Sequence, residues 1–302
     1  MTNAITTQSR SAASNHNRAA LKRQRSNENL ALFGLSIPGI LIFVLALVLP
    51  VGVMAFLSFV GSDGGLSLEN YLRIWESPTY IEIFKVTFGV ALLTTAIVVL
   101  IGYPLAYFLS QLSSRAANLA MLGVLMPFWT AVLVRTYAWL ILLQNRGIIN
   151  NTLIHLGVIN EPLALANNLT GTLIGMVHVM LPFLVLPLYG SMKTVDPNLM
   201  SAASNLGARP TRAFWDVFFP LSLPGLLSGG LMVFVLCIGF YVIPAVLGGG
   251  RVIMVAMRID ANVRLYSSWG AASALGVVLI LVTAILLLLA YWTSRRSAGE
   301  FK

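Results

Sequence analysis

Residues that could do chemistry are few in this sequence and widely spaced. His16, His155 and His178 are each more than 20 residues apart, and Cys237 is the only cysteine. A metal site needs several such ligands at short spacings, so the sequence predicts none. The ten acidic residues fall almost entirely in expected loops, which leaves no Ser-His-Asp arrangement. We therefore expect no catalytic residue, no metal and no cofactor.

A glycine-rich stretch at 248–251 is the nearest approach to a phosphate-binding loop. It reads Gly-Gly-Gly-Arg and lacks the Lys and the Ser or Thr of the G-x-x-x-x-G-K-[ST] loop. It also follows an expected membrane span directly. We therefore expect that this chain is not an enzyme and that this stretch does not bind a nucleotide.

Arg135 is the charged residue that could do binding chemistry, because it lies within an expected membrane span. A charge there costs roughly 2.5–3.5 kcal/mol on insertion scales, so it normally faces the bundle interior or water. Trp129, Tyr137 and Trp139 add aromatic surface around it. One interpretation is that these four residues line a translocation path. The other is that Arg135 extends to the membrane interface within an aromatic belt.

The composition of the chain shows which kind of elements must position these residues. Of its 302 residues, 58% are hydrophobic and 10% are charged, and the mean hydropathy is +0.85. Soluble domains contain about 25% charged residues. A soluble enzyme, a disordered chain and a disulfide scaffold are excluded. The sequence predicts an all-α polytopic membrane protein, in contact with membrane lipid.

Six charge-free stretches are each long enough for the ~20 residues that a membrane-spanning helix requires. The span expected from the third stretch continues past Arg135, and we expect it to remain one span despite this charge. Spacings of the form G-x-x-x-G at 171–175 and 225–229 predict close helix packing. The expected spans cover residues 35–58, 86–110, 118–143, 169–191, 223–247 and 271–293.

The distribution of basic residues predicts the orientation of these spans. The net charge is +9, and 12 of the 19 basic residues fall in segments that are cytoplasmic if both termini are, against six in the outside loops. This bias is topological, so we expect no nucleic-acid partner. We expect a disordered cytoplasmic tail at 1–30, a transmembrane domain at 31–295 and a short cytoplasmic tail at 296–302.

The cytoplasmic stretch 196–220 reads as a helix–glycine–helix elbow. Asp196 followed by proline is typical of a helix start, and Gly207 suits the left-handed position that ends a helix. A second short helix is expected from Arg209-Pro210 to Pro220. Such an elbow is either a docking surface or a helix packed on its own bundle. The apolar residues at helical spacing in the first helix are Leu199, Ala202, Ala203 and Leu206.

The spacing within this elbow resembles the EAA loop of ABC importer permeases. Ser201 stands where that loop usually has a glutamate. The other matching residues are Ala202, Ala203, Gly207, Val217, Phe219 and Pro220. Over about residues 35–295 the chain is similar to the spermidine/putrescine-type permeases, as judged from the segments 127–130, 133–139, 181–189 and 244–249.

This resemblance implies a permease subunit of a binding-protein-dependent ABC importer in the bacterial inner membrane. Its implied partners are an ATPase docking on the loop 201–220, a second permease subunit of a different sequence and a periplasmic solute-binding protein. The ATPase-coupling residues carried over are Ser201, Ala202, Ala203, Gly207, Val217 and Pro220.

The solute is less narrowly indicated. No Asp or Glu lies within an expected span, and Tyr241 with Phe240 occupies a place where related polyamine permeases often have an acidic residue. A polyamine, an opine, an aminophosphonate or another amino-acid derivative therefore stays open, and Tyr241 joins the candidate path. The alternatives are a secondary transporter, which should carry carboxylates within its spans, and a non-transporting scaffold, which would not need broken helices.

Overall fold

The computed structural model describes residue 34 and residues 36–61 and 63–299. The expected tail at 1–30 lies outside the described residues. The chain divides into two units, Met1–Leu57 and Ser58–Lys302. In the first unit, an apolar helical stretch, Ser36–Leu57, is long enough to cross a membrane; it contains the π-helical turn η1 (Val44–Val48) and α2 (Leu49–Leu57).

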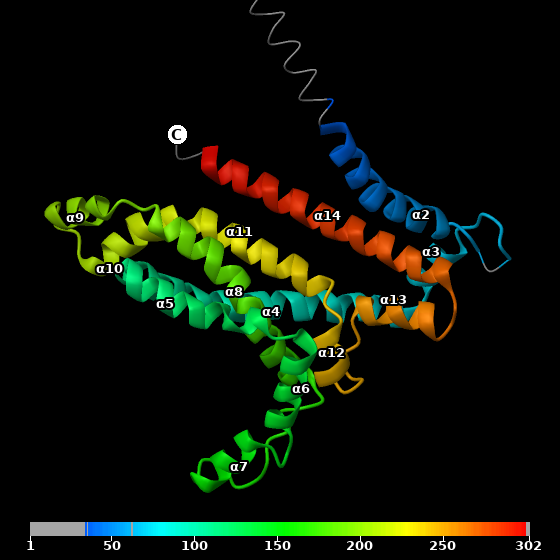
Figure 1. Ribbon diagram of the computed structural model, residues 1–302, viewed down its shortest axis with the longest axis horizontal. Helices are drawn as coiled ribbons and strands as arrows, with labels where there is room; N and C mark the ends of the chain where they lie inside the picture. The colour runs from blue at the N-terminus through cyan, green and yellow to red at the C-terminus, as the bar shows by residue number, and fades with distance from the viewer. Residues whose placement is uncertain (1–33, 35, 62, 300–302) are drawn as a thin grey trace, which may run out of the picture. The chain divides into compact units, whose positions relative to one another are not determined.

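The second unit is built from helices (Figure 1), and the described residues contain no β-strand beyond an isolated bridge between Val60 and Leu66. The expected all-α class is confirmed. In chain order the elements are α3 (Glu69–Glu76), α4 (Pro78–Gln111), α5 (Ser114–Leu125), the 3-10 turn η2 (Met126–Trp129), α6 (Val132–Leu143), α7 (Ile148–His155), α8 (Leu169–Lys193), α9 (Pro197–Asn205), α10 (Pro210–Ala213), the π-helical turn η3 (Phe214–Phe218), α11 (Phe219–Ile238), α12 (Val242–Leu247), α13 (Val255–Arg264) and α14 (Trp269–Gly299).

The number of membrane spans agrees with the sequence. Among the described residues, five helical stretches are long and apolar enough to cross a membrane, and a bent pair of helices makes a sixth if it counts as one span. The helix α14 continues past residue 295, where the sequence suggested a tail, to Gly299. The five stretches are Ser36–Leu57, Pro78–Gln111, Leu169–Lys193, Pro210–Ile238 and Trp269–Leu289.

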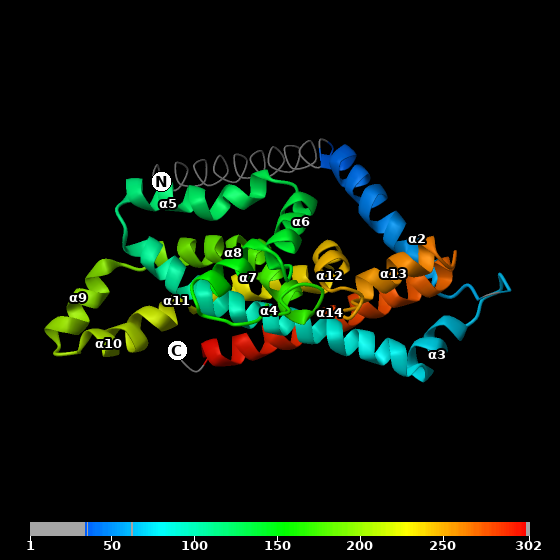
Figure 2. The same cartoon turned by 90° about the horizontal axis from the view of Figure 1, so that it is seen from below.

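The third span is not the single helix that we expected over 118–143. It consists of Ser114–Trp129 and Val132–His155, which are bent by 95° relative to each other; Figure 2 shows α5 and α6 on either side of the bend. Thr130 and Ala131 have extended backbone, and the Thr130 hydroxyl donates to the Pro127 carbonyl at 3.0 Å. The Pro127 carbonyl also accepts the Thr130 N–H at 3.3 Å, so the helix ends in a 3-10 turn that Thr130 closes with both its backbone and its side chain.

The fifth span is also broken, which corrects the expected range 223–247. The helix α11 ends at Ile238 and α12 begins at Val242. At the break, the Phe240 N–H turns back to the Cys237 carbonyl at 3.2 Å instead of continuing the helical ladder. Tyr241 is the residue immediately before α12, so the break presents its side chain between two helical segments.

The helices α4, α8 and α11 pack against one another and form the core of this unit (Figure 1). Gly225 and Gly229 of α11 face α8. A Cβ added at Gly229 would lie 3.1 Å from the backbone oxygen of Leu184, and one at Gly225 would overlap Ser191. The expected close packing at 225–229 is confirmed, because only glycine lets the two backbones approach this closely.

Candidate functional site

The first half of the elbow has the local structure that its sequence predicted. Asp196 Oδ1 accepts a 2.9 Å hydrogen bond from the Asn198 N–H, and Pro197 occupies the first turn of α9. At the other end, Gly207 has φ of +84°, and the Ala208 N–H donates to the Ala203 carbonyl at 3.0 Å. This is the left-handed helix ending that glycine favours. The chain therefore reverses at Gly207.

The second half differs from the expected short helix ending at Pro220. The helix α10 passes through η3 into α11, so residues Pro210–Ile238 form one continuous helical stretch. The Phe219 N–H donates to the Phe214 carbonyl across a wide π-helical turn. Pro220 follows this turn directly and lies in the first turn of α11, where its missing N–H does not end the helix. Val217 and Pro220 thus lie at the base of a span, not at the tip of the elbow.

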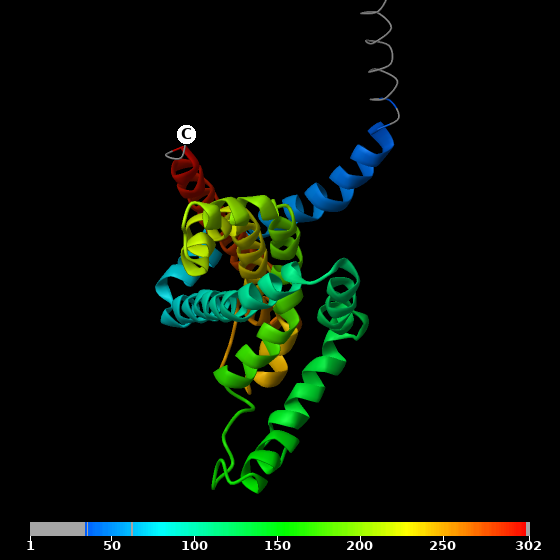
Figure 3. The ribbon, with the colours of Figure 1, turned by 90° about the vertical axis from the view of Figure 1, so that its left-hand side faces the viewer.

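Aromatic side chains anchor the elbow to the ends of α4 and α8. The Tyr107 ring lies edge-on against Phe214 at 5.3 Å and against Phe218 at 5.1 Å, measured between ring centroids. Lys193 Nζ, at the end of α8, donates to the Leu112 carbonyl at 3.3 Å. Met200 of α9 packs on the same apolar cluster. Figure 3 views the unit from the elbow, with α9 and α10 toward the reader.

The opposite side of α9 is exposed in the described chain. We use "the α9 face" for Leu199, Ala202 and Leu206, which are all exposed and are spaced as one side of a helix. Leu206 is 89% exposed. Ala203 is half-buried, so it does not lie fully on this face as the sequence suggested. Ser201 and Gly207 are exposed beside it.

The expected path residues do not form a single cluster. Arg135 is half-buried, and its Nε is a buried atom without a hydrogen-bond partner in the described structure. One turn later, Trp139 lies edge-on against His178 of α8, with 5.6 Å between ring centroids. Trp129 and Tyr137 are instead 73% and 54% exposed. The fold thus brings together Arg135, Trp139 and His178, of which the sequence singled out the first two.

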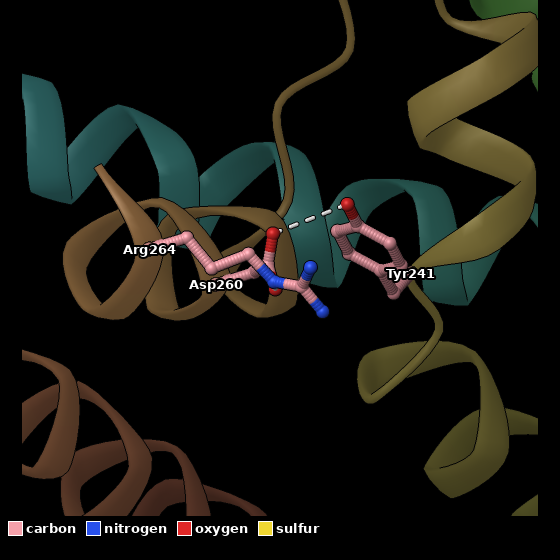
Figure 4. A network of polar contacts seen from close by, with 3 residues as sticks. All are labelled: Tyr241, Asp260 and Arg264. Carbon is pink, nitrogen blue, oxygen red and sulfur yellow. Dashed lines mark hydrogen bonds and ion pairs between the residues drawn. The ribbon is translucent and has the colours of Figure 1, made fainter.

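Tyr241 belongs to a different cluster at the break between α11 and α12 (Figure 4). Its hydroxyl donates to Asp260 Oδ2 at 3.2 Å, and Asp260 Oδ1 accepts a 2.6 Å bond from Arg264 Nε. Asp260 was not selected from the sequence because it lies in a loop region between spans. The i,i+4 spacing of Asp260 and Arg264 was the available signal that α13 carries a paired carboxylate.

Arg258 holds α13 against the beginning of α4. Its guanidinium lies 5.4 Å from the ring centroid of Tyr80 and 5.3 Å from that of Tyr266. Burial opposes the charged form, but the phenol groups of Tyr80 and Tyr266 favour it more, and the pKa of Arg258 is raised above its ordinary value. Arg258 is therefore a fixed positive charge. In the described parts of the chain, no three potential ligands gather in a metal-binding group.

Comparison with known proteins identifies the protein family of this chain. Residues 102–298 match the family of the binding-protein-dependent transport system inner membrane component. The chain belongs to this family. It is an inner-membrane, multi-pass permease subunit of an ABC importer and not itself an enzyme, which decides against the secondary transporter and the scaffold. Permeases of this family work with an ATPase and a binding protein.

Individual relatives agree with this assignment. The chain is 32% identical over 240 residues to the spermidine/putrescine transport system permease protein PotB of Haemophilus influenzae, covering 78% of this chain and 84% of PotB. Against PotB of Escherichia coli it is 32% identical over 230 residues, covering 76% and 83%. The fold is similar to two crystal structures of a bacterial ABC transporter for alginate, with TM-scores of 0.72 and 0.73, 16% identity and coverage of 89% of this chain and 96% of theirs.

Proposed function

We propose that this permease subunit couples the import of a small amine-bearing solute to ATP hydrolysis by a separate ATPase that docks on the elbow. The observation that carries the docking site is Leu206, which is 89% exposed on an elbow that is otherwise anchored. A large apolar side chain held outward beside Ala202 and Gly207 favours contact with a protein surface. Ser201, Ala203, Val217 and Pro220 complete the proposed coupling segment.

The connection of the elbow to the membrane helices supports a coupling role. Because Pro210–Ile238 is one helical stretch, a push on α9 and α10 would move α11 directly. That stretch ends at the break before Tyr241. A displacement at the ATPase would thus reach the point where helix geometry is interrupted and where freed backbone groups can line a cavity.

The remaining partners and the topology follow from the same proposal. A second permease subunit of a different sequence would pair with this one, and a periplasmic binding protein would deliver the solute. The excess of basic residues, 12 against six, supports cytoplasmic termini, with tails at 1–30 and 296–302 flanking a transmembrane domain at 31–295. A reporter fused after residue 302 and one inserted within 61–84 should then report opposite sides of the membrane; agreement between them would contradict this topology.

An amine-bearing solute is supported by the similarity to PotB, whose name assigns it spermidine and putrescine. An opine, an aminophosphonate and other amino-acid derivatives share the amine and remain within the proposal. The proposed path residues are Trp129, Arg135, Tyr137, Trp139 and Tyr241. Aromatic rings among them can attract an ammonium group through their faces.

The docking proposal is tested by changing the α9 face without touching a span. Leu206→Asp places a charge in an apolar contact and should abolish co-purification of the ATPase and solute-stimulated ATP hydrolysis, while membrane abundance stays unchanged. Asn205→Asp adds the same charge at the neighbouring exposed position and serves as the matched control. Normal ATPase binding by Leu206→Asp would show that α9 is not the docking element.

A further inference from the structure

We propose that Asp260 binds the ammonium group of the solute at the helix break, and that Arg264 is a resident cation which the solute displaces. This inference rests on the proposed function, since it requires an amine-bearing solute. It names a specificity residue outside the expected spans, and it identifies the carboxylate that the spans themselves lack.

The position of Asp260 supports a role beyond a surface ion pair. The carboxylate is 30% exposed and accepts bonds from both Tyr241 and Arg264. The described ion pair of the same spacing on the opposite side of the fold, Arg212 with Asp216, has side chains that are 78% and 62% exposed and no third partner. Asp260 differs because it is tied to the residue at which the fifth span breaks.

The Arg264 guanidinium can separate from the Asp260 carboxylate at little cost in stability. Its side chain is 77% exposed and belongs to the same helix as Asp260, one turn away. Such exposed pairs contribute little to stability, since water solvates the freed guanidinium well. Arg264 can therefore swing into solvent without unpacking α13, which is held separately by Arg258 between Tyr80 and Tyr266.

Exchange of one cation for another keeps the Asp260 carboxylate paired within a positively charged segment. The segment 251–264 carries Arg251, Arg258 and Arg264 against the single carboxylate of Asp260, so it repels a free cation overall. A solute ammonium that replaces Arg264 leaves the carboxylate neutralised and moves the displaced charge into water. The ammonium donates to Asp260 Oδ1, and the hydroxyl and ring of Tyr241 lie beside it as the second contact.

The opposite roles of the two charged residues make the proposal testable. We would reconstitute the importer in proteoliposomes with its ATPase and binding protein, and measure initial uptake of labelled putrescine and spermidine at saturating loaded binding protein. Asp260→Asn should lower uptake about tenfold, the loss expected for one charge-assisted contact. Arg264→Gln, which frees the carboxylate, should hold uptake at or above the wild-type rate. Asp260→Glu should retain uptake.

Controls separate this inference from a structural role and from the proposed function. Membrane abundance and ATPase co-purification should match wild type for all variants. Glu82→Gln removes the carboxylate of an exposed ion pair with Lys85 on α4 and should leave uptake unchanged. If Asp260→Asn and Arg264→Gln lower uptake equally, the pair is structural and the inference is wrong. If the wild type carries the amine and Asp260→Asn does so equally well, the inference alone fails. If the wild type carries no amine, the proposed function fails and takes this inference with it.

Discussion

The backbone N–H of Val255 donates a 2.9 Å hydrogen bond to the buried hydroxyl of Thr87, 168 residues earlier in the chain. The same hydroxyl donates to the Ile83 carbonyl at 2.7 Å within α4. Met254, which precedes α13, provides no side-chain cap of its own. A side chain of α4 therefore caps α13, the helix that carries Asp260, from outside.

Thr87→Val should test this cap. Valine keeps the shape but leaves the buried Val255 N–H without a partner, which should destabilise the fold by about 1–3 kcal/mol. The melting temperature of the purified protein in detergent measures the effect. Thr95→Val, whose hydroxyl donates only to the Ala91 carbonyl of its own helix, is the control and should shift the melting temperature less. Equal shifts for the two variants would argue against a special role for Thr87.

The reversal at Gly207 can be tested in the same way. Gly207→Val forces a β-branched residue to φ of +84° and should distort the elbow, so that the ATPase no longer co-purifies. Gly157 has φ of +68° in another exposed turn, and neither glycine has an atom within 4 Å of an added Cβ. Gly157→Val thus imposes similar strain elsewhere and should leave ATPase binding intact.

Ser201 provides the complementary test, because the EAA loop that the elbow resembles usually has a glutamate at this position. Ser201 is exposed, and its hydroxyl makes only a 3.5 Å contact to the Pro197 carbonyl one turn earlier. Ser201→Glu should therefore be tolerated, with wild-type uptake and ATPase co-purification. Loss of coupling in this variant would show that the partner surface has adapted to serine.

The close contact of α8 with α11 predicts a steric effect of a single methyl group. Gly225→Ala places a Cβ against Ser191, and Gly229→Ala places one against Leu184 and Pro187, so each should cost about 1–3 kcal/mol as overpacking. Gly230→Ala has open space around the new methyl group and should be neutral or stabilising. Melting temperatures of the three purified variants compare them directly.

Arg135 should matter for transport more than for folding. Arg135→Ala removes a half-buried guanidinium whose Nε has no partner in the described structure. Uptake should fall about tenfold or more, which is the loss expected when the guanidinium no longer donates one hydrogen bond to an acceptor group of the solute. Membrane abundance should stay near wild type. The exposed loop residue Arg146 supplies the control in Arg146→Ala. A fall in abundance that matches the fall in uptake would indicate a structural role.

The sequence by itself determined features that depend on neighbouring residues. Charge-free stretches specified the apolar helices, because insertion depends on the residues of the span itself. Asp196 and Gly207 specified where α9 begins and ends, since a helix cap is a contact among residues within one turn. The glycines at 225–229 likewise predicted close packing, although the sequence did not tell which helix would face them.

Only the tertiary structure decided where spans break and which distant side chains meet. Prolines occur at Pro182 and Pro187 in the continuous α8, and at Pro127 and Pro244 near breaks, so the residue type alone does not distinguish these outcomes. A helix continues through a proline when packing holds it, and ends when other groups satisfy the freed backbone. The contact of Tyr241 with Asp260 across 19 residues and the cap that Thr87 provides to Val255 across 168 residues both join separate helices, and no local pattern encodes either contact.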